Sequence, residues 1–188
     1  KLVYPNPYIG LEKAILTDPT PAPPVINFPL LLAQINSSDP SAVYLQQPHS
    51  PTSFGMIYPE DREFIVSTIA QFRTLDFGLE RCVATLAIPS PADVENLPDK
   101  RISSSNEPCS LEIWLLDGPE SIRPRTLSWA TRPWRLHLVT TMVVRPGHNL
   151  LDTPEFPCPA RTMLAFELSY SASACHLRFR QNKKSPRL

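Results

Sequence analysis

The side chains best suited to binding chemistry lie in the stretch LSWATRPWRLHL. This stretch holds two indoles and two guanidiniums, from Trp129, Arg132, Trp134 and Arg135. Tryptophan and arginine are enriched at the energetic centres of protein interfaces, and the flat apolar face of an indole also suits stacking on a sugar ring. The stretch therefore predicts a binding surface for a protein or a glycan. The alternative is that one indole anchors the core, the other lies on a loop, and the arginines are solvated or stacked.

No stretch carries a recognised catalytic pattern. A GxSxG nucleophile turn and the glycine-rich loops that bind phosphates are both absent. Three acidic pairs fall in predicted turns, where carboxylates commonly accept backbone N–H groups: Asp76 with Glu80, Asp117 with Glu120, and Asp152 with Glu155. We predict no catalytic residue and a non-enzymatic protein. The alternative is a hydrolase or lyase on a β-sandwich, because carboxylate geometry cannot be seen in one sequence.

The histidines do not have the spacing of a metal site. Strand ligands for a transition metal often stand two residues apart, whereas the four histidines are widely separated: His49, His137, His148 and His176. We therefore predict a structural role for each histidine, and neither a metal nor a cofactor.

The cysteines point to an oxidising compartment. Cys82, Cys109, Cys158 and Cys175 contain no CxxC pair, and four cysteines suit two disulfides with three connectivities. Disulfides persist outside the cytosol, and the triplet NSS makes Asn36 a glycosylation acceptor. We expect an extracellular or cell-surface glycoprotein. Free, buried thiols in a cytosolic domain are the alternative.

Net charge and the length of the apolar runs limit the classes of partner. The 18 basic and 18 acidic residues give a net charge of zero, so we expect no nucleic-acid partner. No apolar run is long enough to cross a membrane. The first ten residues lack the apolar segment of a signal peptide, so in a secreted protein this numbering would start after the signal.

Proline content indicates the fold class. The 23 prolines are about 12% of the chain, against a usual level near 5%, and proline is confined to strand starts, edges and turns. We expect an antiparallel β-sandwich of jelly-roll or immunoglobulin-like type over residues 25–182, after a proline-rich arm (1–24) and before a basic tail (183–188).

The expected strands are short runs bounded by turn residues. They lie within 25–35, 41–46, 53–58, 63–75, 81–89, 110–116, 125–130, 134–144, 162–170 and 175–181. We expect a loop over 89–110, which is rich in proline, serine, asparagine and aspartate. We expect another over 150–161, because it holds three prolines around Cys158. The last strand, CHLRFRQ, places Leu177 and Phe179 inward and its arginines toward water.

The order of several motifs resembles a fungal family, the C-terminal domain of the ubiquitin 3 binding protein (But-two type). The motifs are FPLLLAQINSSDP, FGMIYPEDREFIVSTIAQFRTLDFGLERCVATLAIP, RPG at 145, FPCPA at 156 and CHLRFRQ, spanning about residues 26–182. The resemblance implies a secreted or cell-surface protein without enzyme activity. It also implies that Cys82 pairs with Cys158, which leaves Cys109 with Cys175.

Two non-enzymatic hypotheses follow. The first is a secreted binding protein that recognises a cell-wall glycan or another protein through Trp129 and Trp134. The second is an intracellular interaction domain of a ubiquitin-like modifier pathway. The state of the cysteines distinguishes them, because intact disulfides are rare in the cytosol.

Overall fold

The fold is all-β and antiparallel, as the sequence predicts. The computed structural model describes residues 25–44, 66–74, 78–87, 103–104, 109–118, 120–144, 150–170 and 177–178, and no helix occurs among them. The predicted arm (1–24), the predicted strand 53–58 and the basic tail (183–188) lie outside the described residues.

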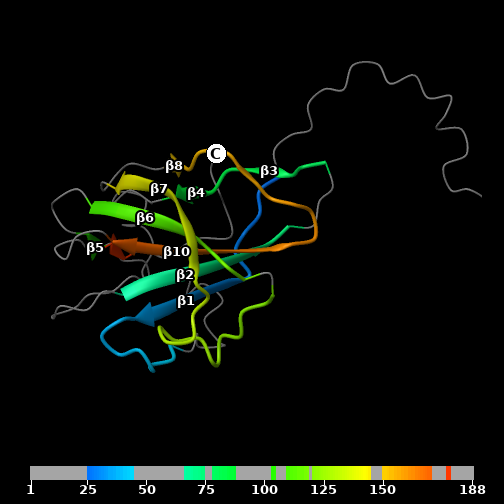
Figure 1. Cartoon of the computed structure of the whole chain (residues 1–188). Coiled ribbons are helices and arrows are strands. Elements are labelled where there is room, and N and C mark those ends of the chain that lie inside the picture. Colours follow the sequence, from blue (N-terminus) through cyan, green and yellow to red (C-terminus); the bar gives the residue numbers. More distant parts are fainter. Residues whose placement is uncertain are drawn as a thin grey trace, which may run out of the picture.

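A five-stranded sheet forms the body of the domain (Figure 1). Its strands, in spatial order, are β1 (Leu31–Asn36), β2 (Val66–Arg73), β10 (Met163–Tyr170), β6 (Cys109–Leu116) and β7 (Arg135–Val144). Each neighbouring pair is antiparallel. The late strand β10 thus lies at the centre of the sheet, and β1 and β7 form its two edges.

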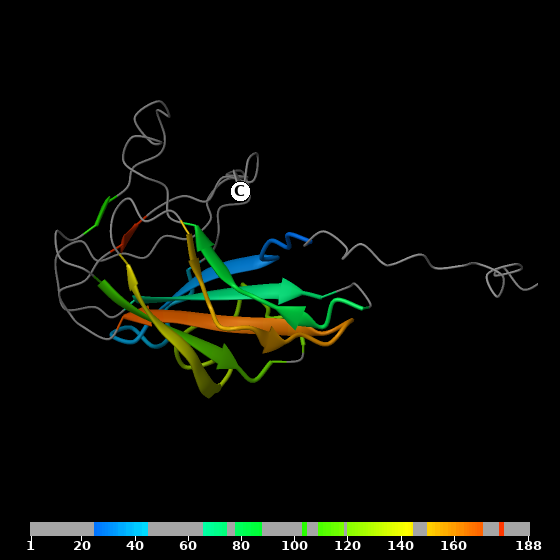
Figure 2. The same ribbon diagram turned by 90° about the horizontal axis from the view of Figure 1, so that it is seen from above.

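Short strands make a second, partial layer (Figure 2). β3 (Arg81–Cys82) pairs with β9 (Phe156–Pro157), and β4 (Thr85–Ala87) pairs with β8 (Leu150–Asp152). Leu86, Leu151 and Phe156 from this layer pack on the apolar clusters of the large sheet. A third small pair joins β5 (Ser103–Ser104) to β11 (Leu177–Arg178).

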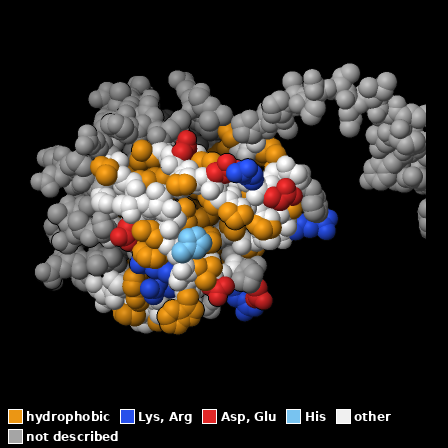
Figure 3. Space-filling view, turned by 45° about the horizontal axis from the view of Figure 1, so that its top comes forward, with side chains coloured by type: hydrophobic (Ala, Val, Ile, Leu, Met, Phe, Trp, Pro, Cys, Tyr) orange, Lys and Arg blue, Asp and Glu red, His pale blue; other side chains and the backbone are white. Residues whose placement is uncertain are grey.

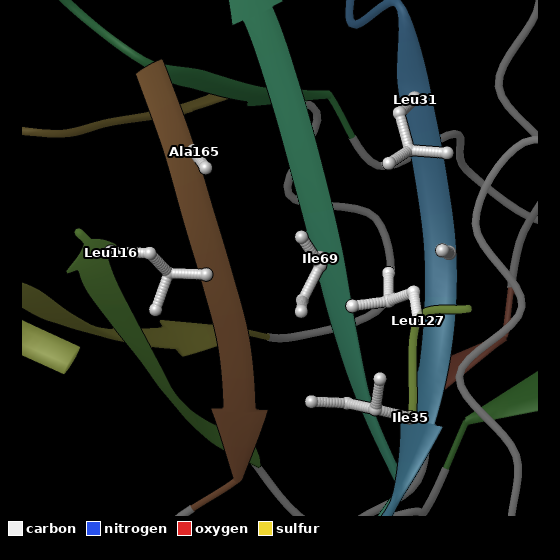
Figure 4. Close-up of a cluster of buried hydrophobic side chains, with 7 residues drawn as sticks. Leu31, Ile35, Ile69, Leu116, Leu127 and Ala165 are labelled. Atoms are coloured by element: carbon white, nitrogen blue, oxygen red, sulfur yellow. The ribbon is translucent and has the colours of Figure 1, made fainter. Parts of the chain in front are cut away.

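The opposite face of the large sheet is covered by the connection between β6 and β7. Ile69 and Ala165 on this face meet Leu127 from the connection, together with Leu31, Ala33, Ile35 and Leu116 (Figure 4). Period-two alternation explains the arrangement, because every second residue of each strand points to the same face. The β6–β7 connection carries the tryptophan–arginine cluster, so this core fixes the position of the candidate site.

The disulfide that the resemblance implies is present between Cys82 and Cys158, whose Cα atoms are 5.8 Å apart. Cys158 is buried, and the bond ties the last residue of β3 to the residue that follows β9. Neither Cys175 nor the side chain of Cys109 is among the described parts of the chain, so their pairing stays a prediction.

Several expected elements are wrong in detail. Residues 81–89 contain two strands, β3 and β4, in place of one, and Cys82, Ala84 and Leu86 are less exposed than their neighbours. The predicted loop 150–161 contains β8 and β9. Its prolines fall beside or within these very short strands, where lost backbone donors cost little.

The predicted strand 125–130 is also wrong, as is the described part (41–44) of the predicted strand 41–46, since both stretches are turns or irregular chain. In the stretch 125–130, a side-chain hydroxyl forms hydrogen bonds with the backbone. The Thr131 hydroxyl donates to the Thr126 carbonyl at 2.6 Å and accepts the Ser128 N–H at 2.9 Å. Such local hydrogen bonds compete with strand pairing.

Candidate functional site

A buried glutamine anchors the segment that carries the site. Gln71, on β2, donates from Nε2 to the Glu120 carbonyl at 2.8 Å and accepts the Ile122 N–H with Oε1 at 3.0 Å. Both functions of its amide are therefore used by the backbone of the β6–β7 connection. Leu127 from the same connection is buried in the core below. The connection is thus held to the sheet by both polar and apolar contacts.

Trp129 and Arg132 form a stacked pair within this connection. The guanidinium carbon of Arg132 lies 3.6 Å from the centre of the Trp129 ring, and Nη1 donates to the Trp129 carbonyl at 2.8 Å. Trp129 itself packs against the sheet core. Of the predicted binding residues, Trp129 therefore has a packing role, as in the alternative that one indole anchors the core.

A buried carboxylate draws the two arginines together. The side chain of Glu167, on the central strand β10, has 0% exposure. Arg135 donates to it twice, from Nε to Oε2 at 3.1 Å and from Nη2 to Oε1 at 2.7 Å. Arg132 adds an ion pair, Nε to Oε2 at 3.4 Å, that lacks hydrogen-bond geometry. A bidentate arginine–carboxylate pair is among the strongest side-chain contacts.

Trp114 completes the arrangement from β6. The Arg135 guanidinium carbon lies 4.8 Å from its ring centre, and the indole N–H donates to Glu112 Oε2 at 2.9 Å. The hydrogen bonds to Glu167 raise the pKa of Arg135, burial opposes this, and the charges of Glu167 and Glu112 raise it further. The guanidinium is therefore always charged. We call Glu167, Arg132, Arg135, Trp129 and Trp114 the arginine clamp.

Sequence reasoning identified both arginines and Trp129 but missed Glu167 and Trp114. A signal for Glu167 exists in the strand MLAFELSY, where the period-two pattern places it on the same face as Ala165 and Ser169. A charged residue on a buried face demands a partner of opposite charge. The identity of that partner could not be read, because it depends on register across β6.

Trp134 differs from the clamp residues. It is 83% exposed, and it precedes two exposed leucines on β7, Leu136 at 57% and Leu138 at 41%. The Asp117 N–H donates to the Trp134 carbonyl at 2.8 Å, so the backbone at the base of this indole is tied down. Figure 3 shows exposed hydrophobic side chains spread around a histidine on this part of the surface. We call Trp134, Leu136 and Leu138 the apolar strip.

The model of one protein family matches most of the chain. It describes the C-terminal domain of the ubiquitin 3 binding protein But2, and it matches residues 27–185. The chain belongs to the But2 family. No curated protein matches the chain. The matched range contains every described strand, the arginine clamp and the apolar strip, so the site belongs to the But2 domain itself.

Three of the acidic side chains considered as candidates have local partners in the But2 domain. Glu155 forms an ion pair with Arg81, and Asp152 accepts the Thr85 hydroxyl at 2.6 Å. Glu80 accepts the Gly78 N–H at 2.9 Å. Within the described ranges there is no cluster of three or more histidine, cysteine or acidic side chains placed to hold a metal. In the same ranges no helix is long and apolar enough to cross a membrane.

Asn36, the predicted glycan acceptor, is buried in the But2 domain. Its Nδ2 donates to the Tyr44 hydroxyl at 3.2 Å, and its Oδ1 accepts the Ser38 N–H at 2.9 Å. The second contact is an Asx turn, which shapes the chain after β1. Burial and these two contacts give the Asn36 side chain a structural role.

Proposed function

We propose that this chain is a secreted or cell-surface binding domain without enzyme activity, and that its partner is a protein. The observation that carries the proposal is Trp134, an 83% exposed indole beside the arginine clamp. Large exposed apolar side chains are costly to keep in water, and contiguous groups of them mark interaction sites. The family description, a ubiquitin 3 binding protein, supports a protein as the partner.

The clamp suits such a role because it is rigid. Arg135 is the first residue of β7 and follows Trp134 directly, and its two hydrogen bonds to buried Glu167 hold this point of the backbone. An anchor that is already ordered loses little conformational entropy on binding. Tryptophan with neighbouring arginine is also the composition of interface hot spots.

The disulfide between Cys82 and Cys158 supports an extracellular or cell-surface location, because such bonds are reduced in the cytosol. The test is the mass of the protein recovered from its native source, with and without a thiol-alkylating reagent under non-reducing conditions. An unmodified Cys82–Cys158 pair supports secretion. Alkylation of both cysteines would contradict it.

The binding proposal is tested by photocrosslinking from the apolar strip. A benzophenone amino acid replaces Leu136, and the matched control carries it at Val83, an exposed apolar residue between β3 and β4. Both proteins are irradiated in the extracellular fraction of the cells that make them. We expect a protein adduct from position 136 that is absent from position 83 and lost in Trp134→Ala. No adduct at 136, or equal adducts at both positions, would refute the proposal.

Two other partners have a specific observation in their favour. The family description, a ubiquitin 3 binding protein, favours a ubiquitin-type protein, which titration with purified ubiquitin tests. The exposed Trp134 ring would also stack on a sugar, which an array of cell-wall glycans tests. Binding of either probe that is lost in Trp134→Ala would assign the partner to that class and replace the secreted protein-binding proposal.

A further inference from the structure

The two edges of the large sheet differ in how they are protected. Every residue of β1, from Leu31 to Asn36, is buried or half-buried. In β7, Leu136 to Leu138 are all exposed and residues 141–144 alternate between exposed and buried, and among the described residues the backbone of β7 pairs with β6 alone. An edge strand presents a row of N–H and C=O groups on its free side. Among the described residues nothing pairs with the free side of β7, and its exposed residues place this edge at the solvent.

The irregularities of β7 lie in one half of the strand. The pairing with β6 shifts register between Ile113 and Trp114 and between Leu115 and Leu116, which affects Arg135 to Val139. From Thr140 to Val144 the pairing is regular. Bulges are one of the ways in which proteins prevent an edge from pairing. Here they leave the second half of β7 free to accept a partner strand.

The composition of that second half also lacks protection. The sequence TTMVV, residues 140–144, contains no charge and no proline, and four of its five residues are β-branched. Edges that avoid pairing usually carry lysine, an inward charge or proline. Thr141 and Val143 are exposed on one face, whereas Met142 and Val144 are buried on the other. A strand laid beside them would extend both faces of the sheet.

The exposed area indicates a small partner element. Trp134, Leu136, Leu138 and Val143 are 83%, 57%, 41% and 54% exposed. With full residue areas of roughly 150–250 Å², these fractions leave about 500 Å² of accessible surface. A stable interface needs about 800 Å² from each side. These four side chains by themselves therefore supply less area than a stable pairing of two copies buries in total, and they match the size of a short extended segment.

We infer that a partner protein adds an extended, uncharged segment of alternating apolar and small polar residues to β7, as a sixth strand beside Thr140–Val144. The apolar strip flanks this edge and receives the end of the segment. Main-chain hydrogen bonds supply affinity in such strand addition, and alternate side chains supply specificity. This inference rests on the proposed function, because it specifies how the bound protein is held.

The test uses a defined probe. A labelled eight-residue peptide that alternates valine with threonine is titrated into the full chain, beside the same peptide with alternate amides N-methylated. Methylation removes backbone donors and leaves the side chains unchanged. We expect the unmethylated peptide to bind at least tenfold more tightly, and to slow amide hydrogen exchange at residues 140–144. Equal binding of the two peptides, or no binding of either, would overturn strand addition.

Two matched lysine variants test whether the peptide binds at β7. Val143→Lys puts a charge on the open edge, and Val83→Lys puts one on a valine that is 49% exposed between β3 and β4. We expect Val143→Lys to weaken peptide binding at least tenfold and Val83→Lys to change it less than twofold. Equal effects would overturn the inference. So would a wild-type dimer in sedimentation equilibrium that Val143→Lys dissociates, since a second copy would then occupy the edge.

The photocrosslink from position 136 separates the two proposals. If the adduct persists in Val143→Lys at wild-type yield, the protein-binding function holds and strand addition at β7 fails. If wild type gives no adduct, the proposed function fails as well.

Discussion

Replacing Arg135 by methionine tests the energetic centre of the site. The substitution removes both hydrogen bonds to Glu167, at 3.1 and 2.7 Å, and leaves a carboxylate with 0% exposure. Its remaining cation is Arg132, whose Nε lies 3.4 Å from Oε2 without hydrogen-bond geometry. Removing one partner of a buried ion pair costs about 3–5 kcal/mol. We expect the free energy of unfolding of Arg135→Met to fall by about this amount.

Arg132→Met provides the comparison within the clamp. It leaves the bidentate contact between Arg135 and Glu167 intact, and removes the stack on Trp129, one hydrogen bond to its carbonyl and the ion pair with Glu167. The stack and the hydrogen bond account for about 1–2 kcal/mol, and the ion pair adds less because it lacks hydrogen-bond geometry and Arg135 still pairs with Glu167. Arg125→Met, an exposed substitution outside the clamp, serves as the control and is expected to change stability by less than about 0.5 kcal/mol.

The double variant Arg135→Met with Glu167→Met distinguishes the ion pair from simple packing. An apolar pair of similar volume often replaces a buried ion pair with little loss of stability. We therefore expect the double variant to be more stable than Arg135→Met alone. Urea unfolding followed by circular dichroism gives the free energy of unfolding of the wild type and of the four variants. The reasoning is refuted if Arg135→Met costs no more than Arg132→Met, or if the double variant is less stable than Arg135→Met.

Three further predictions concern the scaffold. Gln71→Leu leaves the Glu120 carbonyl and Ile122 N–H without their partner, so we expect a loss of about 2–3 kcal/mol and faster hydrogen exchange over 120–134; unchanged exchange would contradict the anchoring role. Replacing Cys82 and Cys158 together by alanine opens a link of 76 residues, for which loop-closure entropy predicts a loss of about 4.5 kcal/mol, and a melting temperature within a few degrees of wild type would contradict this. Asn36→Ala should cost about 1–2 kcal/mol through loss of the Asx turn, and enzymatic deglycosylation of wild type should leave its mass unchanged; a mass loss that is absent in Asn36→Ala would contradict the structural role.

The long strands of the sheet were predictable because their alternation is strong. β2, β7 and β10 lie within ranges expected from hydrophobic patterning, and β6 begins one residue before its expected range, at Cys109. The short strands β8 and β9 were missed because each spans three residues or fewer in a proline-rich stretch, where pairing with β4 and β3 decides the structure. Propensity has little influence on strands of that length, since tertiary contacts override it.

The site was predictable as a cluster but not as an arrangement. The spacing of Trp129, Arg132, Trp134 and Arg135 identified the right segment. Only the fold separates their roles, because Trp129 packs on the core while Trp134 points to solvent. The partner that fixes Arg135 is Glu167, which is 32 residues from Arg135 in sequence and two strands away in the sheet. Contacts of that kind depend on strand order, which local patterning does not contain.

The clamp and the open edge are connected through β7. Arg135, the first residue of that strand, is fixed to the central strand β10 across β6, while the other end of β7 is paired regularly with β6. An edge strand held at both ends keeps its free hydrogen-bonding groups in line, so an added strand meets a surface that is already ordered. A buried charge with two arginines is an expensive way to gain stability alone, because apolar residues would serve as well. The ion pair instead fixes an orientation. Its two hydrogen bonds hold the Arg135 guanidinium in one geometry, which apolar contacts would not do. The start of β7 and the base of the Trp134 ring are held in place with it.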